Sequence, residues 1–193
     1  AQMDIFEQYF YDINQFGRVP GNNKPHSDPL DILEDKLDIF HTTLTLSGSD
    51  NIFSLPSVYY RSIVTLTDDG FEIQKVSVKE AMQISQASLT SPTLKRPIYY
   101  IDNNNRINII PSTITSGMFH YYRAPTTVQW NGYDTPSGQL YNETESTNFE
   151  LHLSEEPNLV LNILKLAGIA MKDASLYQLG AAEEAKDIQQ EKQ

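Results

Sequence analysis

The spacing of apolar residues changes twice along this chain, and this change constrains the fold more than any other sequence feature. Apolar side chains recur every three or four residues in segment 2–16 and in a segment that begins at residue 27, as in amphipathic helices. Between residues 43 and 123 the spacing falls to two, which is typical of strands, and from residue 154 the helical spacing returns. The pattern therefore predicts an α+β fold: a helical bundle formed by the N- and C-terminal segments, with an inserted antiparallel β-sheet or small barrel region.

The domain boundaries follow from the same pattern. Residues 1–42 and 154–193 are predicted to form the helical region, and residues 43–153 the inserted β region, with a long loop at 124–148. Because residue 1 already lies inside the first helical pattern, we expect further residues ahead of it. Strands are predicted at 43–46, 62–67, 71–76, 97–102, 106–111, 117–123 and 149–153.

Short local signals support the elements of the β region. Asp68-Asp69-Gly70 and Asn103-Asn104-Asn105 are typical of hairpin turns, because Asp, Asn and Gly tolerate positive φ. The segment 77–80, Ser-Val-Lys-Glu, has the pattern of a capping box and predicts a short helix directly after it.

The C-terminal region predicts two helices that differ in apolar content. In the first, Ser154 is expected as the N-cap, Pro157 lies in the first turn and Gly168 ends the helix. The second starts at about residue 174 and has so thin an apolar stripe that we expect it to dock on another subunit or protein. Its strong apolar positions are Leu176, Tyr177, Leu179 and Ile188.

Composition excludes several function classes. The chain has 14 Lys and Arg against 25 Asp and Glu, a net charge of −11, which argues against a protein that binds nucleic acid through its phosphates. An acidic surface does fit a channel wall past which DNA must slide. There are no cysteines, which excludes disulfides and thiolate metal sites. The sequence also has no run of about 18 apolar residues, so we do not expect a membrane as a partner.

No residue pattern predicts catalysis or metal binding. The four histidines, at positions 26, 41, 120 and 152, lie in separate predicted elements, and none has a second histidine at the i+4 spacing of a helical metal site. We interpret them as surface or interfacial residues, with His152 beside Glu150 on the outer face of the last predicted strand. Accordingly we predict that the chain is not an enzyme and uses no metal or cofactor.

Tyrosine is the unusual residue type, with 11 copies that include three doublets in or near predicted strands. Neighbouring residues of a strand point to opposite faces, so each doublet can place one ring inside and one outside. Exposed tyrosines are favoured at protein interfaces, but cross-strand packing within one subunit explains them equally well. The doublets are Tyr59-Tyr60, Tyr99-Tyr100 and Tyr121-Tyr122.

A series of motifs runs through the second half of the chain. It consists of Tyr121-Tyr122-Arg123-Ala124-Pro125-Thr126, then Trp130, then Phe149-Glu150-Leu151, an acidic helix start with proline, an apolar helix that ends Ala167-Gly168-Ile169, and a charged terminal segment. Over roughly residues 95 to 193 this series resembles the neck-ring proteins of crAss-like tailed bacteriophages.

The resemblance implies a viral structural protein of the virion, found at the junction of portal and tail after synthesis in the bacterial host cytoplasm. Such a head-tail connector, or portal adaptor, forms a homododecamer that extends the DNA channel from the head towards the tail. Its expected partners are copies of itself, the portal protein, neighbouring tail or neck ring proteins, and passing genomic DNA without sequence-specific binding. The resemblance implies no catalytic residue in this sequence.

The expected subunit or portal interface combines the motif residues with the apolar positions of the terminal helix. The loop at 124–148 either reaches a neighbouring subunit or packs on its own chain. The alternative function is a carbohydrate- or receptor-binding β module of a phage virion, in which Trp130, Tyr133 and Tyr141 would stack on sugars. The expected interface residues are Tyr121, Tyr122, Arg123, Trp130, Phe149, Leu151, Leu153, Leu176, Tyr177, Leu179 and Ile188.

Overall fold

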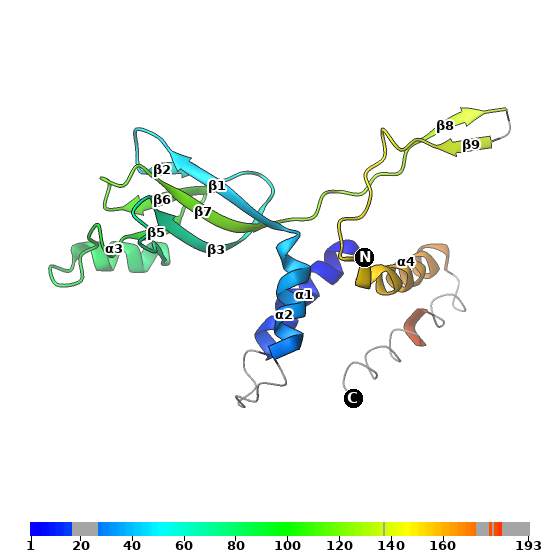
Figure 1. Cartoon of the computed structure of the whole chain (residues 1–193), viewed down its shortest axis with the longest axis horizontal. Helices are drawn as coiled ribbons and strands as arrows, with labels where there is room; N and C mark the ends of the chain where they lie inside the picture. Colours follow the sequence, from blue (N-terminus) through cyan, green and yellow to red (C-terminus); the bar gives the residue numbers. More distant parts are fainter. Residues whose placement is uncertain (17–26, 137, 173–177, 179, 183–193) are drawn as a thin grey trace. The chain divides into compact units, whose positions relative to one another are not determined.

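A computed structural model describes residues 1–16, 27–136, 138–172, 178 and 180–182 of the chain (Figure 1). The chain divides into two compact units, one formed by Ala1–Ile39 with Pro125–Gln193 and the other by Phe40–Ala124. The described residues combine helices with several sheets, which confirms the predicted α+β class. The sheets in these ranges are open, so the alternative of a small barrel is wrong for the described part of the chain.

The first unit contains the helices at both ends of the chain. Helices α1 and α2 pack against each other, and each buries its apolar face: Ile5, Phe6 and Tyr9 on α1, and Leu33 and Leu37 on α2. The amphipathic helix predicted at the N-terminus is therefore confirmed. The elements of this unit are α1 (Gln2–Phe16), α2 (Ser27–Asp38), β8 (Gly132–Thr135), β9 (Gly138–Tyr141), the 3₁₀ helix η2 (Leu153–Glu155) and α4 (Glu156–Met171).

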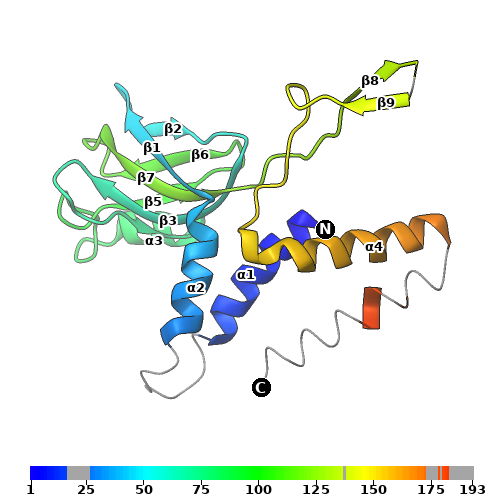
Figure 2. The same ribbon diagram turned by 45° about the vertical axis from the view of Figure 1, so that its right-hand side comes forward.

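The second unit is built from two small sheets and one helix (Figure 2). The first sheet has the strand order β1-β7-β3 and the second β2-β6-β5-β4, in which β4 and β5 are parallel and the other pairs antiparallel. Its elements are β1 (His41–Ser47), β2 (Ile52–Ser54), β3 (Tyr59–Thr67), β4 (Gln74–Lys75), α3 (Val78–Gln86), β5 (Ile98–Ile101), β6 (Arg106–Ile110) and β7 (Ser116–Arg123).

The core of the second unit lies between these two sheets. Phe119 of β7 is fully buried and meets Tyr99 of β5 edge to face, with ring centroids 6.0 Å apart. Ile107 and Ile109 of β6 and Leu46 of β1 belong to the same cluster. Side chains from both sheets therefore share one apolar core.

Local turn and cap signals in the second unit are confirmed. Ser77 and Glu80 form both hydrogen bonds of the capping box at the start of α3. Gly70 has φ +80° in the turn after β3, and Asn105 has φ +55° in the turn between β5 and β6. Both turns therefore contain a residue with positive φ, the backbone conformation that Gly and Asn tolerate.

Other predictions fail where a long-range contact overrides the local pattern. The strand predicted at 149–153 does not form, because Glu150 bonds to Gln2 and Thr126 instead of to a neighbouring strand. The strand predicted at 71–76 is reduced to β4, with one isolated bridge between Leu66 and Glu72. The sequence also did not predict strands β2, β8 and β9.

The start and end of α4 differ from the prediction as well. Ser154 is not the N-cap, because it lies inside η2 and its backbone N–H donates to the side chain of His152. Helix α4 then continues past Gly168, which is buried, and ends at Lys172 with φ +56°. The second C-terminal helix lies largely outside the described residues. Gly180, one of the residues of this segment that the structure describes, lies against Leu161 and Lys165 of α4. No helix in the described ranges has the length and apolar content needed to cross a membrane.

Gly117 is expected to be essential for the β1-β7-β3 sheet. A Cβ at this position would lie 2.4 Å from the carbonyl oxygen of Leu66, a backbone atom in the neighbouring strand that cannot rotate away. Gly117→Ala should therefore lower the free energy of unfolding by about 1–3 kcal/mol, the usual cost of overpacking. Urea denaturation measures the change. Gly48→Ala is the matched control, because its Cβ would have neighbours no closer than 3.6 Å. Equal effects of the two substitutions would contradict the steric argument.

Candidate functional site

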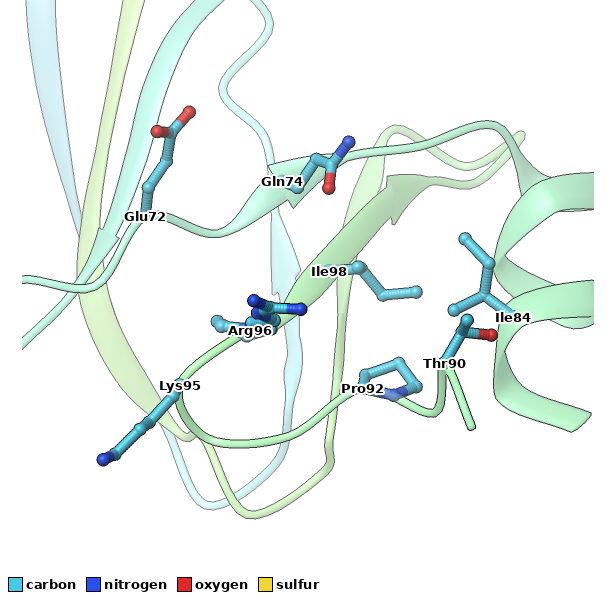
Figure 3. A pocket seen from close by; sticks show the side chains of 9 residues that line it. Glu72, Gln74, Ile84, Thr90, Pro92, Lys95, Arg96 and Ile98 are labelled. Atoms are coloured by element: carbon cyan, nitrogen blue, oxygen red, sulfur yellow. The ribbon is translucent and has the colours of Figure 1, made fainter. Parts of the chain in front are cut away.

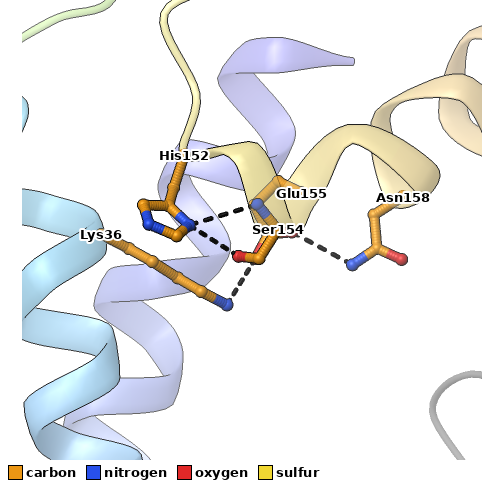
Figure 4. Close-up of polar contacts among 5 residues, drawn as sticks. All are labelled: Lys36, His152, Ser154, Glu155 and Asn158. Carbon is orange, nitrogen blue, oxygen red and sulfur yellow. Dashed lines mark hydrogen bonds and ion pairs between the residues drawn. The ribbon is translucent and has the colours of Figure 1, made fainter.

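A buried ion pair connects the N-terminal helices to the start of α4 (Figure 4). Glu155, at the end of η2, is 5% exposed, and its carboxylate accepts a hydrogen bond from Nζ of Lys36 on α2 at 2.5 Å. The other carboxylate oxygen accepts a bond from Asn158 at 3.0 Å. Since buried carboxylates are stable only when paired, these bonds fix the position at which α4 begins.

Groups on α1 surround this ion pair. The Lys36 ammonium lies 5.7 Å from the centre of the Tyr9 ring, whose hydroxyl has no hydrogen-bond partner among the described residues. Burial, with a smaller contribution from the Glu155 carboxylate, raises the pKa of Tyr9 well above its ordinary value. Burial also raises the pKa of Asp12, although Lys36 acts in the opposite direction. The Lys36–Glu155 ion pair therefore lies beside two acidic groups, Tyr9 and Asp12, whose ionisation is disfavoured by burial.

A second polar contact explains two of the sequence motifs. The Glu150 carboxylate accepts bonds from the backbone N–H and the hydroxyl of Thr126, at 2.8 and 2.9 Å. Gln2 of α1 bonds to both partners: its amide donates to the Thr126 carbonyl, and its side-chain oxygen accepts from the Glu150 backbone N–H. Glu150 and His152 therefore do not form the predicted solvated pair, because His152 bonds to Ser154. The Pro-Thr and Phe-Glu-Leu motifs meet in one three-residue clamp.

Helix α4 exposes a long uncharged apolar stripe, which we call the α4 stripe. Its five side chains, Val160, Ile163, Leu166, Ile169 and Met171, are 38–64% exposed. The helix is apolar on nearly all sides and carries just two charged residues, Glu156 and Lys165. A helix of this composition is normally buried, so the α4 stripe is the strongest candidate interaction surface of the described chain.

The long predicted loop contains a second exposed apolar surface, which we call the aromatic hairpin. Strands β8 and β9 pair with each other, and in the described ranges neither makes an extensive contact with another helix or strand. Trp130, just before β8, is 59% exposed, and its ring lies 6.4 Å from that of Tyr141. Tyr133 and Leu140 are also exposed. Within the described ranges, the two strands of this loop therefore pair mainly with each other.

The structure places the predicted interface residues in different environments. Tyr121 is 4% exposed and stacks on Phe119, so it belongs to the core of the second unit. Tyr122 is half-buried, and Arg123 lies over the ring of Phe40. In the other unit Trp130, Phe149 and Leu153 are exposed and Leu151 is half-buried. The predicted residues Leu176, Tyr177, Leu179 and Ile188 lie outside the described residues.

Strand pairing brings together two histidines that the sequence did not connect. Nε2 of His41 on β1 lies 3.1 Å from Nδ1 of His120 on β7, and the hydroxyl of Thr43 lies 3.0 Å from the same Nδ1. The β1–β7 register produces the contact, and no local spacing could have revealed it. Two imidazoles are fewer than the three protein ligands of a typical zinc site, and the described residues contain no cluster of three or more metal-ligating side chains.

A groove of about 690 Å³ lies beside α3, β4 and the segment that precedes β5 (Figure 3). Ile84, Pro92 and Ile98 face one another at one end, whereas the Lys95 side chain points away from them. The polar lining residues therefore do not converge on one point, as they do in sites that orient a small ligand.

Comparison of the chain with protein-family models and with curated proteins finds no match.

The Lys36–Glu155 pair gives a direct test of what holds the first unit together. Glu155→Gln would leave the largely buried Lys36 ammonium without its counter-charge, so stability should fall towards the lower end of the roughly 3–5 kcal/mol typical of broken buried pairs. Glu156→Gln is the matched control, because Glu156 is the next residue and is exposed. Denaturant unfolding of both variants measures the difference. A loss no larger for Glu155→Gln than for the control would show that the pair contributes little.

Asp12 is expected to make stability depend on pH. Burial raises its pKa above 3.8 in the folded state, so its contribution to stability is complete below the unfolded value and is lost as pH rises through the folded value. Asp12→Asn stays neutral and should therefore be more stable than the parent at pH 7, with a difference that shrinks towards pH 3. Thermal unfolding across this range measures it, with Asp31→Asn, at an exposed position of α2, as control. A difference that grows on acidification would reverse the assignment.

Proposed function

We propose that this chain is a structural subunit of the neck of a tailed bacteriophage: a ring-forming adaptor that extends the portal DNA channel and joins the head to the tail. The observation that carries the proposal is the α4 stripe. A helix this apolar is stable in water when another surface covers it, and in a ring each subunit supplies such a surface to its neighbour.

The helices of the first unit are proposed to form the bundle from which the ring is built. Two contacts support this proposal: the Lys36–Glu155 pair, which joins α2 to the start of α4, and the clamp of Gln2, Thr126 and Glu150. Both connect the two ends of the chain within one unit. Phe149 and Leu153 are exposed next to these contacts in the sequence, so they extend the apolar surface available to a neighbour.

The net charge supports the same proposal. With −11 per copy, a ring of these subunits would repel the phosphates of passing DNA and allow it to slide. The resemblance to crAss-like neck-ring proteins supplies the expected twelve-fold symmetry and the expected partners, the portal and the adjoining rings. The virion neck is then the location in which the chain functions.

A carbohydrate- or receptor-binding module is the second candidate, and the aromatic hairpin is the observation that favours it. Exposed Trp130 and Tyr141 could stack on sugar rings. This function gives no role to the apolar face of α4, however, so we place it second.

A symmetry-averaged cryo-EM map of the portal to tail junction in the intact phage tests the proposal. We expect to trace twelve copies of this chain in a ring around the DNA channel, with the α4 stripe covered. Tracing the chain in fibres or on the capsid surface would contradict the neck assignment and would favour the receptor-binding function. The portal in the same map is an internal control for correct symmetry averaging.

A further inference from the structure

One chain carries two exposed apolar surfaces that differ in shape. The α4 stripe runs along a helix and winds partly around it, and the aromatic hairpin is a narrow two-stranded ribbon. An isolated two-stranded hairpin is marginally stable in water, so this ribbon needs a surface to pack against.

The strand register puts large apolar side chains on both faces of the aromatic hairpin, with Asp134 and Gln139 as a polar pair on one of them. Tyr133 and Leu140 are directly opposite each other and share one face. Gly132 and Tyr141 share the other face, where the Trp130 ring lies so close to Gly132 that an added Cβ would be 2.6 Å from it. Each face therefore offers at least one large aromatic ring, the residue type that most often anchors an interface.

The acidic hairpin meets no acidic residue on the exposed apolar part of α4. Segment 129–147, which contains the hairpin, carries Asp134, Glu143 and Glu145 and no basic residue. The exposed apolar part of α4, residues 160–171, carries one charged residue, Lys165, whereas Glu156 lies at the start of the helix and Lys172 and Asp173 follow its end. Two copies of a chain with net charge −11 repel each other in general, so this match favours one mode of approach over others.

We propose that the aromatic hairpin of one copy packs on the α4 stripe of the next copy. The inference rests on the proposed ring function and names the contact that would build the ring. Because the hairpin and the stripe are different surfaces, each pair of copies leaves one hairpin and one stripe unused. The contact is therefore head to tail, and it extends to further copies until the ring closes.

The absence of cysteine allows a site-specific cross-linking test. One copy carries Gln139→Cys, at an exposed position in β9, and the other carries Ala170→Cys, at an exposed position in α4. The two are mixed at about 1 mM each, where even a contact with a Kd of that size is about 40% occupied, and treated with a short bis-maleimide. We expect a cross-linked heterodimer in the mixture, with a peptide map that joins the introduced thiol of β9 to the introduced thiol of α4.

Matched substitutions identify the surfaces involved. Leu166→Glu in the α4 stripe, or Trp130→Ala in the hairpin, should reduce the cross-link at least tenfold, whereas Leu89→Glu, at a fully exposed apolar residue of the other unit, should not. Circular dichroism checks that each variant is folded. A chain that carries both introduced thiols serves as the test for a contact within one copy, and an intramolecular cross-link at high dilution would overturn the proposal. Absence of the heterodimer at about 1 mM would also overturn it.

The cross-link and the map of the neck separate the two proposals. A specific cross-link in a protein that is absent from the neck supports the contact and contradicts the proposed function. A ring in the neck with the hairpin away from α4 of the adjacent copy keeps the function and overturns the contact.

Discussion

The buried contact between Lys36 and Glu155 determines how the two ends of this chain are held in one unit. The two residues are 119 positions apart, and the whole second unit, Phe40–Ala124, lies between them in the sequence. Closing so long a loop costs conformational entropy, which the ion pair and the apolar faces of α1 and α2 must offset. A shift of α4 by one residue would bury a carboxylate without its cation. The pair therefore selects one register, which is the best-attested role of buried charges.

Beyond its start, α4 makes few extensive contacts with the other helices and strands that the structure describes. Leu159, in the first turn, is buried, whereas the five side chains of the α4 stripe remain exposed. Thus the apolar content of α4 exceeds what the described part of this unit can bury. The same is true of the aromatic hairpin, whose two strands bond to each other and expose Tyr133 and Leu140. Both surfaces remain exposed because the described part of this unit is joined largely by polar contacts and has a small apolar core.

Elements defined by local sequence could be predicted, and contacts defined by the fold could not. The helix at 2–16, the capping box at Ser77 and the turns at Gly70 and Asn105 depend on neighbouring residues, so their patterns sufficed. Ser154 had the right type for an N-cap, but His152 forms the bond that stabilises η2 there. Gly168 had the right type for a helix end, but the residues that follow continue the helix to Met171. For the candidate surface, Trp130, Phe149 and Leu153 could be selected as apolar residues, whereas Tyr121 could not be separated from them without knowing which face of β7 is buried.

The proposed head-to-tail contact would also allow an acidic chain to assemble without a large apolar area at every edge. Long-range repulsion between copies of charge −11 disfavours indiscriminate association, and in salt it decays over about 10 Å. At short range, residues 160–171 of α4 contain no acidic side chain, so an acidic ribbon such as the aromatic hairpin meets little repulsion there. Most of the acidic residues that give the chain its net negative charge then remain on surfaces outside this contact. In a ring they would face the solvent or the channel, so that the repulsion that limits faulty assembly would also keep DNA from adhering to the wall.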